Sequence, residues 1–166
     1  MSKQKTTTTV GVIDDQVLAF TAGKDVDLDR HLIDADCMGT AAHVTMLSKM
    51  PLKPKFLTAR EVREIIGELV AIMKASRTGT FAITLADQDV HLAVERTLTE
   101  RLGELGKKIH TGRSRNDQVA VDLRLFMREQ LLGCLADLAE LAGALLAFAE
   151  SHQSVPMVGR THMQPG

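Results

Sequence analysis

A single apolar stripe at helical spacing, in the last third of the chain, constrains the fold more than any other feature. Between Leu131 and Phe148 its positions are separated by alternating steps of three and four residues, which is the spacing of one helix face and of a coiled-coil seam. The stripe extends backward through Phe126, Leu123 and Val119. It predicts a helix of roughly 35 residues, about 50 Å long. A small domain cannot cover such a stripe by itself, so the pattern predicts partner helices.

Two arrangements would cover this stripe. The helix could pair with a second copy in a free-standing coiled-coil dimer, or it could be one strut of a large helical bundle. The periodicity is the same in both cases and therefore leaves both open.

The composition favours helices and argues against nucleic-acid binding. The 166 residues include five Phe but neither Trp nor Tyr, so little aromatic material is available for strands or for stacking on bases. The net charge is −1, whereas nucleic-acid-binding domains are usually basic. A chain of this length normally forms one domain or two small ones.

Cysteine spacing and the N-terminal segment indicate a cytoplasmic protein. Cys37 and Cys134 lie far apart, without the spacing of a zinc site or a disulfide framework, and we expect both to be small core residues. The first eleven residues are rich in Thr and lack the apolar core of a signal peptide. Asp137 and Glu140 interrupt the Leu-rich stretch, so we expect no membrane span.

Shorter helical patterns precede the long one. Apolar positions predict a first helix from Leu28 to Met46, which Pro51 then ends. Thr58 and Glu61 have the spacing of a capping box, so they predict the start of a second helix. Gly79 is expected to end this second helix.

A third helix is expected between Asp89, as its N-cap, and Gly106, as its stop. The predicted class is therefore all-α, with a small N-terminal helical domain over residues 1–110. Residues 111–166 would form the start of a central helical-bundle domain, of which the long helix is the first.

The segment His110–Gln118 is dense in polar side chains and directly precedes the long helix. A helix N-terminus offers unpaired N–H groups and a partial positive charge, to which Arg113 and Arg115 add two cations. The planar fork of arginine binds a carboxylate through two bonds, and Ser114 and Asn116 orient neighbouring atoms without adding charge. The segment therefore predicts a carboxylate-binding site. The alternative is a helix cap flanked by solvated arginines.

The chain closes with the polar segment Val158–Gly166, which is punctuated by Gly and Pro and follows a helix whose apolar stripe lacks partners. We interpret the chain as a fragment of a longer protein. The alternative is a frayed tail.

These motifs carry a resemblance to a known family. His110–Gln118, with the sequence HTGRSRNDQ, resembles the motif of the argininosuccinate lyases, within the fumarase/aspartase superfamily. Four further segments follow the order and approximate spacing of that family: Phe20–Lys24, Asp29–Arg30, Asp89–His91 and Gly159–Gln164. The Thr-His segment at the end occurs more widely in the superfamily, whereas His110–Gln118 supports the argininosuccinate lyase branch.

The resemblance implies a lyase that splits argininosuccinate into arginine and fumarate by anti elimination, with neither a metal nor an organic cofactor. Proton removal beside a carboxylate builds up negative charge, which fixed donors must stabilise. By resemblance, the substrate is held by Ser114, Arg115, Asn116, Asp29, Asp87, Asp89 and His91. Thr161 and His162 are the expected catalytic residues, with His162 as a general acid or part of a relay.

The chain also departs from the family. Gln88 stands where a Glu is usual. Family members are more than twice as long, and their catalytic serine lies in a mobile loop far downstream. Their active sites combine segments from three subunits of a homotetramer. We therefore expect self-association, argininosuccinate as the substrate, no nucleic-acid or membrane partner, and no activity from this chain alone.

Some motif residues have plainer interpretations. Arg113 is expected to play a structural part, and His91 could form a helix-surface pair with Glu95. His31, His43 and His152 are expected to pack or to face solvent. Three other functions stay open: a different lyase of the superfamily, a crystallin-like protein without activity, and a helical association module.

Overall fold

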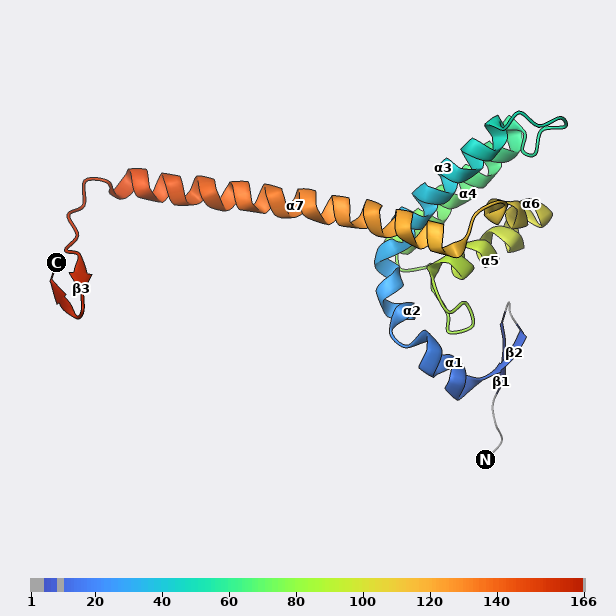
Figure 1. Cartoon of the computed structure of the whole chain (residues 1–166), viewed down its shortest axis with the longest axis horizontal. Helices are drawn as coiled ribbons and strands as arrows, with labels where there is room; N and C mark the ends of the chain where they lie inside the picture. Colours follow the sequence, from blue (N-terminus) through green and yellow to red (C-terminus); the bar gives the residue numbers. More distant parts are fainter. Residues whose placement is uncertain (1–4, 9–10, 166) are drawn as a thin grey trace. The chain divides into compact units, whose positions relative to one another are not determined.

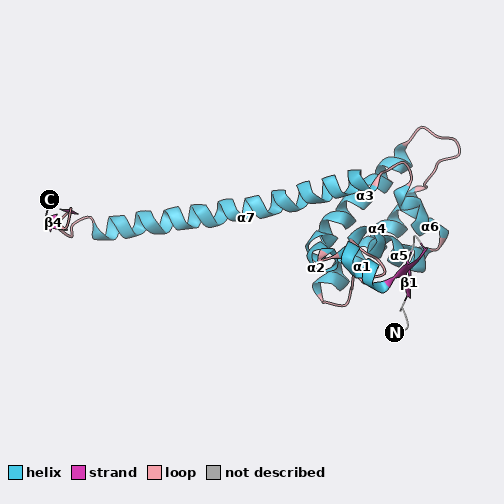
Figure 2. Cartoon of the chain, turned by 60° about the horizontal axis from the view of Figure 1, so that its bottom comes forward, coloured by secondary structure: helices cyan, strands magenta, loops and turns pink. Residues whose placement is uncertain are grey.

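The computed structural model describes residues 5–8 and 11–165. Helices dominate the described chain (Figure 2), so the predicted all-α class is confirmed. The chain divides into two compact units, Met1–Phe126 and Met127–Gly166, and each is described by itself. The sequence places a boundary at residue 110 because the helical pattern breaks there. That domain division stays a prediction.

The first unit begins with a hairpin that the sequence analysis did not predict. Strands β1 (Lys5–Thr8) and β2 (Gly11–Asp14) pair antiparallel, with Thr7 opposite Val12. Helix α1 (Asp15–Ala22) follows directly, and the side chain of Asp14 caps it by accepting a hydrogen bond from the backbone N–H of Gln16 at 3.0 Å. Two short segments, α2 (Asp25–Leu28) and the 3₁₀ helix η1 (Asp29–Leu32), lead into the main helices.

The core of this unit lies between α3 (Ile33–Lys49), α4 (Ala59–Arg77) and α5 (Val90–Leu102), where α3 and α4 lie side by side (Figure 1). Helices α4 and α5 contribute the apolar faces that their spacing predicts. In α3 the apolar core residues are Ile33, Cys37, Val44 and Leu47, and Met46 of the predicted face is exposed. The largest fully buried apolar side chains of the unit are Leu18, Ile33, Val44, Leu57, Ile65, Leu69, Ile72, Val90, Val94, Leu98 and Ile109. These contacts fix α5, and hence its N-terminus, against α3.

The helix starts predicted at Thr58 and Asp89 are confirmed, whereas the first helix, predicted from Leu28, begins at Ile33. The Thr58 hydroxyl accepts a hydrogen bond from the N–H of Glu61 at 3.2 Å, and the Glu61 carboxylate accepts one from the N–H of Thr58 at 2.7 Å. Asp89 caps α5 by accepting a hydrogen bond from the N–H of Leu92 at 3.0 Å. Gly79, just beyond the last residue of α4, has φ 72, the left-handed conformation of a helix C-terminus.

The prediction that Gly106 ends the third helix is wrong. Helix α5 ends at Leu102, and Gly103, with φ 61, follows it. Gly106 lies inside the short helix α6 (Glu104–Lys107) for a different reason. A Cβ atom there would lie 2.5 Å from the backbone carbonyl of Leu98, so only glycine allows α6 to pack this closely on α5.

A 3₁₀ turn, η2 (Lys108–His110), then leads to α7 (Arg115–His152). This helix has 38 residues, which confirms the long helix predicted from the apolar stripe. Its first turns belong to the first unit, where Gln118 and Asp122 are buried.

The second unit holds the rest of α7 and a small hairpin of β3 (Arg160–Thr161) and β4 (Gln164–Pro165). Every described residue of this unit is exposed, including Leu138 and Leu145 of the stripe. Cys134 is also exposed, so its predicted core position is wrong for the described chain, whereas Cys37 is buried as predicted. The cause is that the face carrying Cys134 has no partner within the unit.

By length and composition alone, α7 is a helix that could cross a membrane. A helix from the centre of a soluble bundle meets the same criterion, because both bury apolar residues along their length. The expected absence of a membrane span stays a prediction.

Candidate functional site

A rigid turn precedes α7 and presents the polar motif. The N–H of Arg113 donates to the carbonyl of His110 at 3.2 Å, and Gly112 has φ 70. Thr111 has φ −59 and ψ 124, so the four residues form a type II turn, which requires the positive φ that glycine supplies at its third position. The ring of His43, on α3, bonds to the carbonyl of Thr111 at 3.0 Å. The turn is therefore stabilised by a side chain of α3 as well as by its own backbone hydrogen bond.

Ser114 caps α7. Its hydroxyl accepts a hydrogen bond from the N–H of Asn116 at 3.2 Å, and its own N–H donates to the carboxylate of Asp117 at 3.0 Å. This reciprocal capping, like that at Thr58, satisfies backbone groups that the helix leaves unpaired. The predicted helix N-terminus is thus confirmed, and its cap fixes the backbone that carries Arg115.

Arg115 extends from the first turn of α7 to Asp89, the cap of α5, and forms an ion pair with its carboxylate. Asp29, from η1, accepts a hydrogen bond from the N–H of Val90 at 3.1 Å. Three segments far apart in sequence therefore meet at the start of α5. The structure brings together Asp29, Asp89 and Arg115, with Ser114 and Asn116 adjacent in the chain.

The electrostatics of this junction suit a ligand that carries both signs of charge. Burial raises the pKa of Asp29 above its ordinary value, and the nearby Asp89 adds to the rise, although the bond from Val90 opposes it. A cationic group of a ligand would relieve this cost of burying two carboxylates. Arg115 is about half exposed, and a guanidinium has five N–H donors. It therefore retains donors for a second carboxylate.

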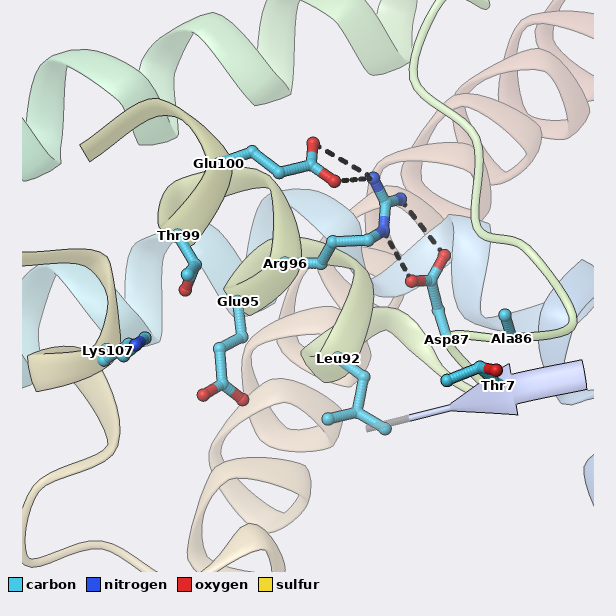
Figure 3. A pocket seen from close by; sticks show the side chains of 9 residues that line it. All are labelled: Thr7, Ala86, Asp87, Leu92, Glu95, Arg96, Thr99, Glu100 and Lys107. Carbon is cyan, nitrogen blue, oxygen red and sulfur yellow. Dashed lines mark hydrogen bonds and ion pairs between the residues drawn. The ribbon is translucent and has the colours of Figure 1, made fainter. Parts of the chain in front are cut away.

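Asp87 lies apart from this junction. Its carboxylate bonds to Arg96 at 2.6 and 3.1 Å and accepts hydrogen bonds from the N–H and the hydroxyl of Thr84. Burial opposes ionisation, but these bonds outweigh it and hold the pKa of Asp87 below its ordinary value. Figure 3 shows this ion pair at the edge of a cavity of about 460 Å³, together with Leu92 and Lys107. The cavity contains none of the residues of the His110–Gln118 motif.

His91 points inward and is only 4% exposed. Its Nδ1 bonds to Asp36 of α3 and lies 3.5 Å from the carboxylate of Asp122 of α7. The alternative that His91 pairs with Glu95 on the helix surface is wrong. Glu95 instead lies 3.1 Å from Nε2 of His110.

The group around His91 is also the place where a metal ion could be held. Asp36, His91 and Asp122 each offer a ligand atom, and these atoms lie within 4.8 Å of one another. A second cavity, of about 630 Å³, lies along α3 and the first turns of α7, and Arg113 and Gln118 contribute to its wall. Arg113 donates to the hydroxyl of Thr40 at 3.3 Å, as its expected structural part requires.

Thr161 and His162 lie in the second unit. Thr161 is the last residue of β3, opposite Gln164, and His162 and Met163 form the turn with φ 50 and 66. Positive φ is uncommon for both residue types. Both predicted catalytic residues are exposed, and their roles, like those of the predicted substrate-binding residues, stay predictions.

The sequence analysis missed Asp36 and Asp122, and it gave no separate role to Gln118 of the motif; all three are buried and polar. A signal was present, because Asp36 follows Leu32 by four residues and precedes Gly39 by three, on the face predicted to be buried. Gln118 and Asp122 are likewise one turn apart at the start of α7. A charged residue on a buried face requires a partner.

Comparison with known proteins gives consistent matches. A model of the lyase family matches residues 21–166. The argininosuccinate lyase of Phocaeicola vulgatus is 40% identical over 152 residues, which cover 92% of this chain and 33% of that protein. That of Geobacter sulfurreducens is 40% identical over 151 residues, 91% of this chain and 32% of its own length. The argininosuccinate lyase of Synechococcus sp. is 43% identical over 146 residues, which cover 88% of this chain and 30% of that protein. The chain thus spans about a third of the length of the curated relatives it matches.

Proposed function

This chain belongs to the lyase family, and on that premise we propose that a protein of its relatives' length that contains it cleaves argininosuccinate to arginine and fumarate. We call that protein the full-length protein. The observation that carries the proposal is the identity of about 40% to argininosuccinate lyases along nine-tenths of the chain. The junction of Asp29, Asp89 and Arg115 supports it because argininosuccinate carries both carboxylates and a guanidinium group.

In the proposed complex, Arg115 and Asn116 bind a carboxylate of the succinyl part of the substrate. Ser114 donates its hydroxyl hydrogen to the same group, while its oxygen continues to cap the helix. Asp29 and Asp89 face the cationic arginine part. Arg115 keeps its ion pair with Asp89 and binds the substrate carboxylate through its remaining N–H donors, because that ion pair engages a single terminal nitrogen.

The elimination removes a proton from the carbon beside the carboxylate, and its electron pair forms the double bond of fumarate as the carbon–nitrogen bond breaks. The leaving guanidino nitrogen gains a proton and departs as arginine. Negative charge builds up on the carboxylate before that bond breaks, so Arg115 stabilises the transition state more than the ground state. Thr161 and His162, which lie in the second unit, are proposed to serve the substrate carboxylate and the proton transfer in the assembled protein. The proton-abstracting serine implied by the resemblance lies outside these 166 residues, so the chain alone is proposed to be inactive.

Helix α7 supports a proposal of self-association through its exposed apolar stripe. Its stripe from Leu131 to Phe148 is apolar and exposed in the described chain, and burial of apolar area is worth about 25 cal/mol per Å². We propose that copies of the full-length protein cover it in a homotetramer. We also propose that the protein is cytoplasmic.

The test is a substrate panel on the purified full-length protein. Fumarate is followed by its ultraviolet absorbance with argininosuccinate, adenylosuccinate and aspartate in parallel, and the 166-residue chain is assayed alongside. We expect fumarate from argininosuccinate alone, and none from the short chain.

Activity on adenylosuccinate or aspartate instead would assign the protein to another lyase of the superfamily. Inactivity of a folded, tetrameric full-length protein on all three substrates would indicate a structural protein. Turnover by the short chain at the rate of the full-length protein would refute the proposed need for further residues.

A further inference from the structure

Four buried polar side chains lie next to the residues of the candidate site and are given no step in the proposed chemistry, although the resemblance places one of them, His91, at the substrate. Asp36, Gln118 and Asp122 are at most 2% exposed, and His91 is 4% exposed. They come from α3, α5 and α7. We call them the buried polar cluster. Burying charged groups is costly unless they are paired, so the cluster requires a physical explanation.

Asp36 is the hub of this cluster. One of its carboxylate oxygens, Oδ2, accepts from Nε2 of Gln118 at 2.5 Å and also bonds to Nδ1 of His91. A single oxygen of α3 thereby ties the first turn of α5 to the first turn of α7. Asp122 adds an electrostatic contact, because one of its oxygens lies 3.5 Å from the same nitrogen of His91.

The two tied turns are those that carry the candidate site. His91 lies two residues after Asp89, and Gln118 lies three residues, about one helical turn, after Arg115. The separation of Asp89 from Arg115 therefore depends on how α5 and α7 are held at Asp36. Displacing either helix by one ångström at the cluster displaces one partner of the ion pair by a similar amount, because each helix is rigid over one turn.

We propose that Asp36, His91, Gln118 and Asp122 are positioning residues that hold the N-termini of α5 and α7 at the separation needed for Arg115 to bind the substrate carboxylate. The inference rests on the proposed function and extends it to residues that do not touch the substrate.

The cluster contains cationic as well as acidic groups. Burial opposes protonation of His91, but the bond to Asp36 and its charge outweigh that effect and raise its pKa. Burial and the neighbouring Asp36 raise the pKa of Asp122 to about 7. The half-buried Arg113 adds a positive charge beside both carboxylates. Two cationic groups, His91 and Arg113, thus lie beside the two acidic groups and offset their charge.

The packing around Asp122 is also close. A Cβ atom on Gly39, in α3, would lie 3.2 Å from Oδ1 of Asp122 and 3.3 Å from Val121. Those contacts are shorter than usual, so a side chain at position 39 would press α7 away from α3. Gly39 therefore helps to keep α7 close to α3 at the buried polar cluster.

The test is a double-mutant cycle in the full-length protein between Asp36→Asn and Arg115→Lys. If Asp36 acts through Arg115, the Asp36→Asn change lowers kcat/KM about 10- to 100-fold in the wild-type background, the loss that a displacement of about one ångström causes. The same change has less than a threefold effect in the Arg115→Lys background. A role in stability alone would give equal losses in both backgrounds and would refute the proposal. Asp34→Asn is the matched control, since it is on the same helix and its carboxylate forms an exposed ion pair with Arg77; it should change kcat/KM less than twofold.

Two further measurements keep the proposal testable whatever the first result. If Asp36→Asn does not fold, Gln118→Met removes one bond at similar volume and takes its place in the cycle. Amide hydrogen exchange of the peptide 114–122, without substrate, should be faster in either variant than in Asp34→Asn. Unchanged exchange in this peptide would overturn the positioning role, whether or not the wild-type protein is an active lyase. Absence of lyase activity in the wild-type protein would overturn only the proposed function. A rise in Tm of the wild type, but not of Asp36→Asn, on addition of Mg²⁺, Mn²⁺ or Zn²⁺ would replace the positioning role with a metal site.

Discussion

Gly106 provides a quantitative test of the packing between α6 and α5. There is no room for a methyl group at this position. An ideal Cβ atom would lie 2.5 Å from the carbonyl carbon and oxygen of Leu98 and 2.6 Å from the backbone nitrogen of Thr99. These are backbone atoms of a packed helix, so they cannot rotate away. Relief requires a shift of about 1 Å between α6 and α5, and overpacking of this kind costs about 1–3 kcal/mol. We therefore expect Gly106→Ala to lower the free energy of unfolding by about 2–3 kcal/mol, or roughly 4–12 °C in Tm.

The assay is urea and thermal unfolding of the 166-residue chain, followed by circular dichroism. Two other glycines are the controls. Gly67→Ala, in the exposed middle of α4 with nothing within 4 Å of its Cβ position, should raise the free energy of unfolding by about 0.5–1 kcal/mol. Gly103→Ala has the same open space but φ 61 and ψ −132, and should lower it by about 1–3 kcal/mol. Equal stability of Gly106→Ala and the wild type would refute the packing described for α6.

Three further predictions concern the core, the capping box and the stripe. Ile65→Ala, at a fully buried position, should lower the free energy of unfolding by about 2–5 kcal/mol in the same urea assay, and a loss below 1 kcal/mol would contradict the described core. Bonds from Thr58 lower the pKa of Glu61 to about 2, so Glu61→Gln should destabilise the chain at neutral pH, with the difference disappearing as pH falls from about 4.5 toward about 2; a difference independent of pH would contradict this linkage. Leu138→Glu with Leu145→Glu should convert a self-associating chain into a monomer by light scattering, and a wild-type chain that is already a well-folded monomer would contradict self-association through the stripe.

Local chemistry made part of the fold predictable. The capping box of Thr58 and Glu61, and the cap at Asp89, depend on residues within three positions of one another, so sequence spacing alone identifies them. The long helix was predictable for a similar reason, since its apolar steps repeat without interruption. The β1–β2 hairpin, with Thr-rich strands and no buried alternation, lacked any such signal.

Features that depend on distant contacts were not predictable. Gly103 and Gly106 offer the same local signal for a helix end, and only the contact of Gly106 with Leu98 distinguishes them. The bonds of Asp36 reach across 55 residues to His91 and 82 residues to Gln118. No spacing rule covers such separations, so the motif indicated the carboxylate site while the cluster beneath it became visible only in the folded chain.

The central claim is that Arg115, held at the start of α7, binds the substrate carboxylate as negative charge develops. Its most direct test is the kcat/KM of the full-length protein for fumarate release from argininosuccinate, measured for the wild type, Arg115→Ala and the exposed control Arg124→Ala. We predict a loss of about 10²- to 10³-fold for Arg115→Ala and less than a twofold change for Arg124→Ala. Equal kcat/KM values for Arg115→Ala and the wild type would contradict the account.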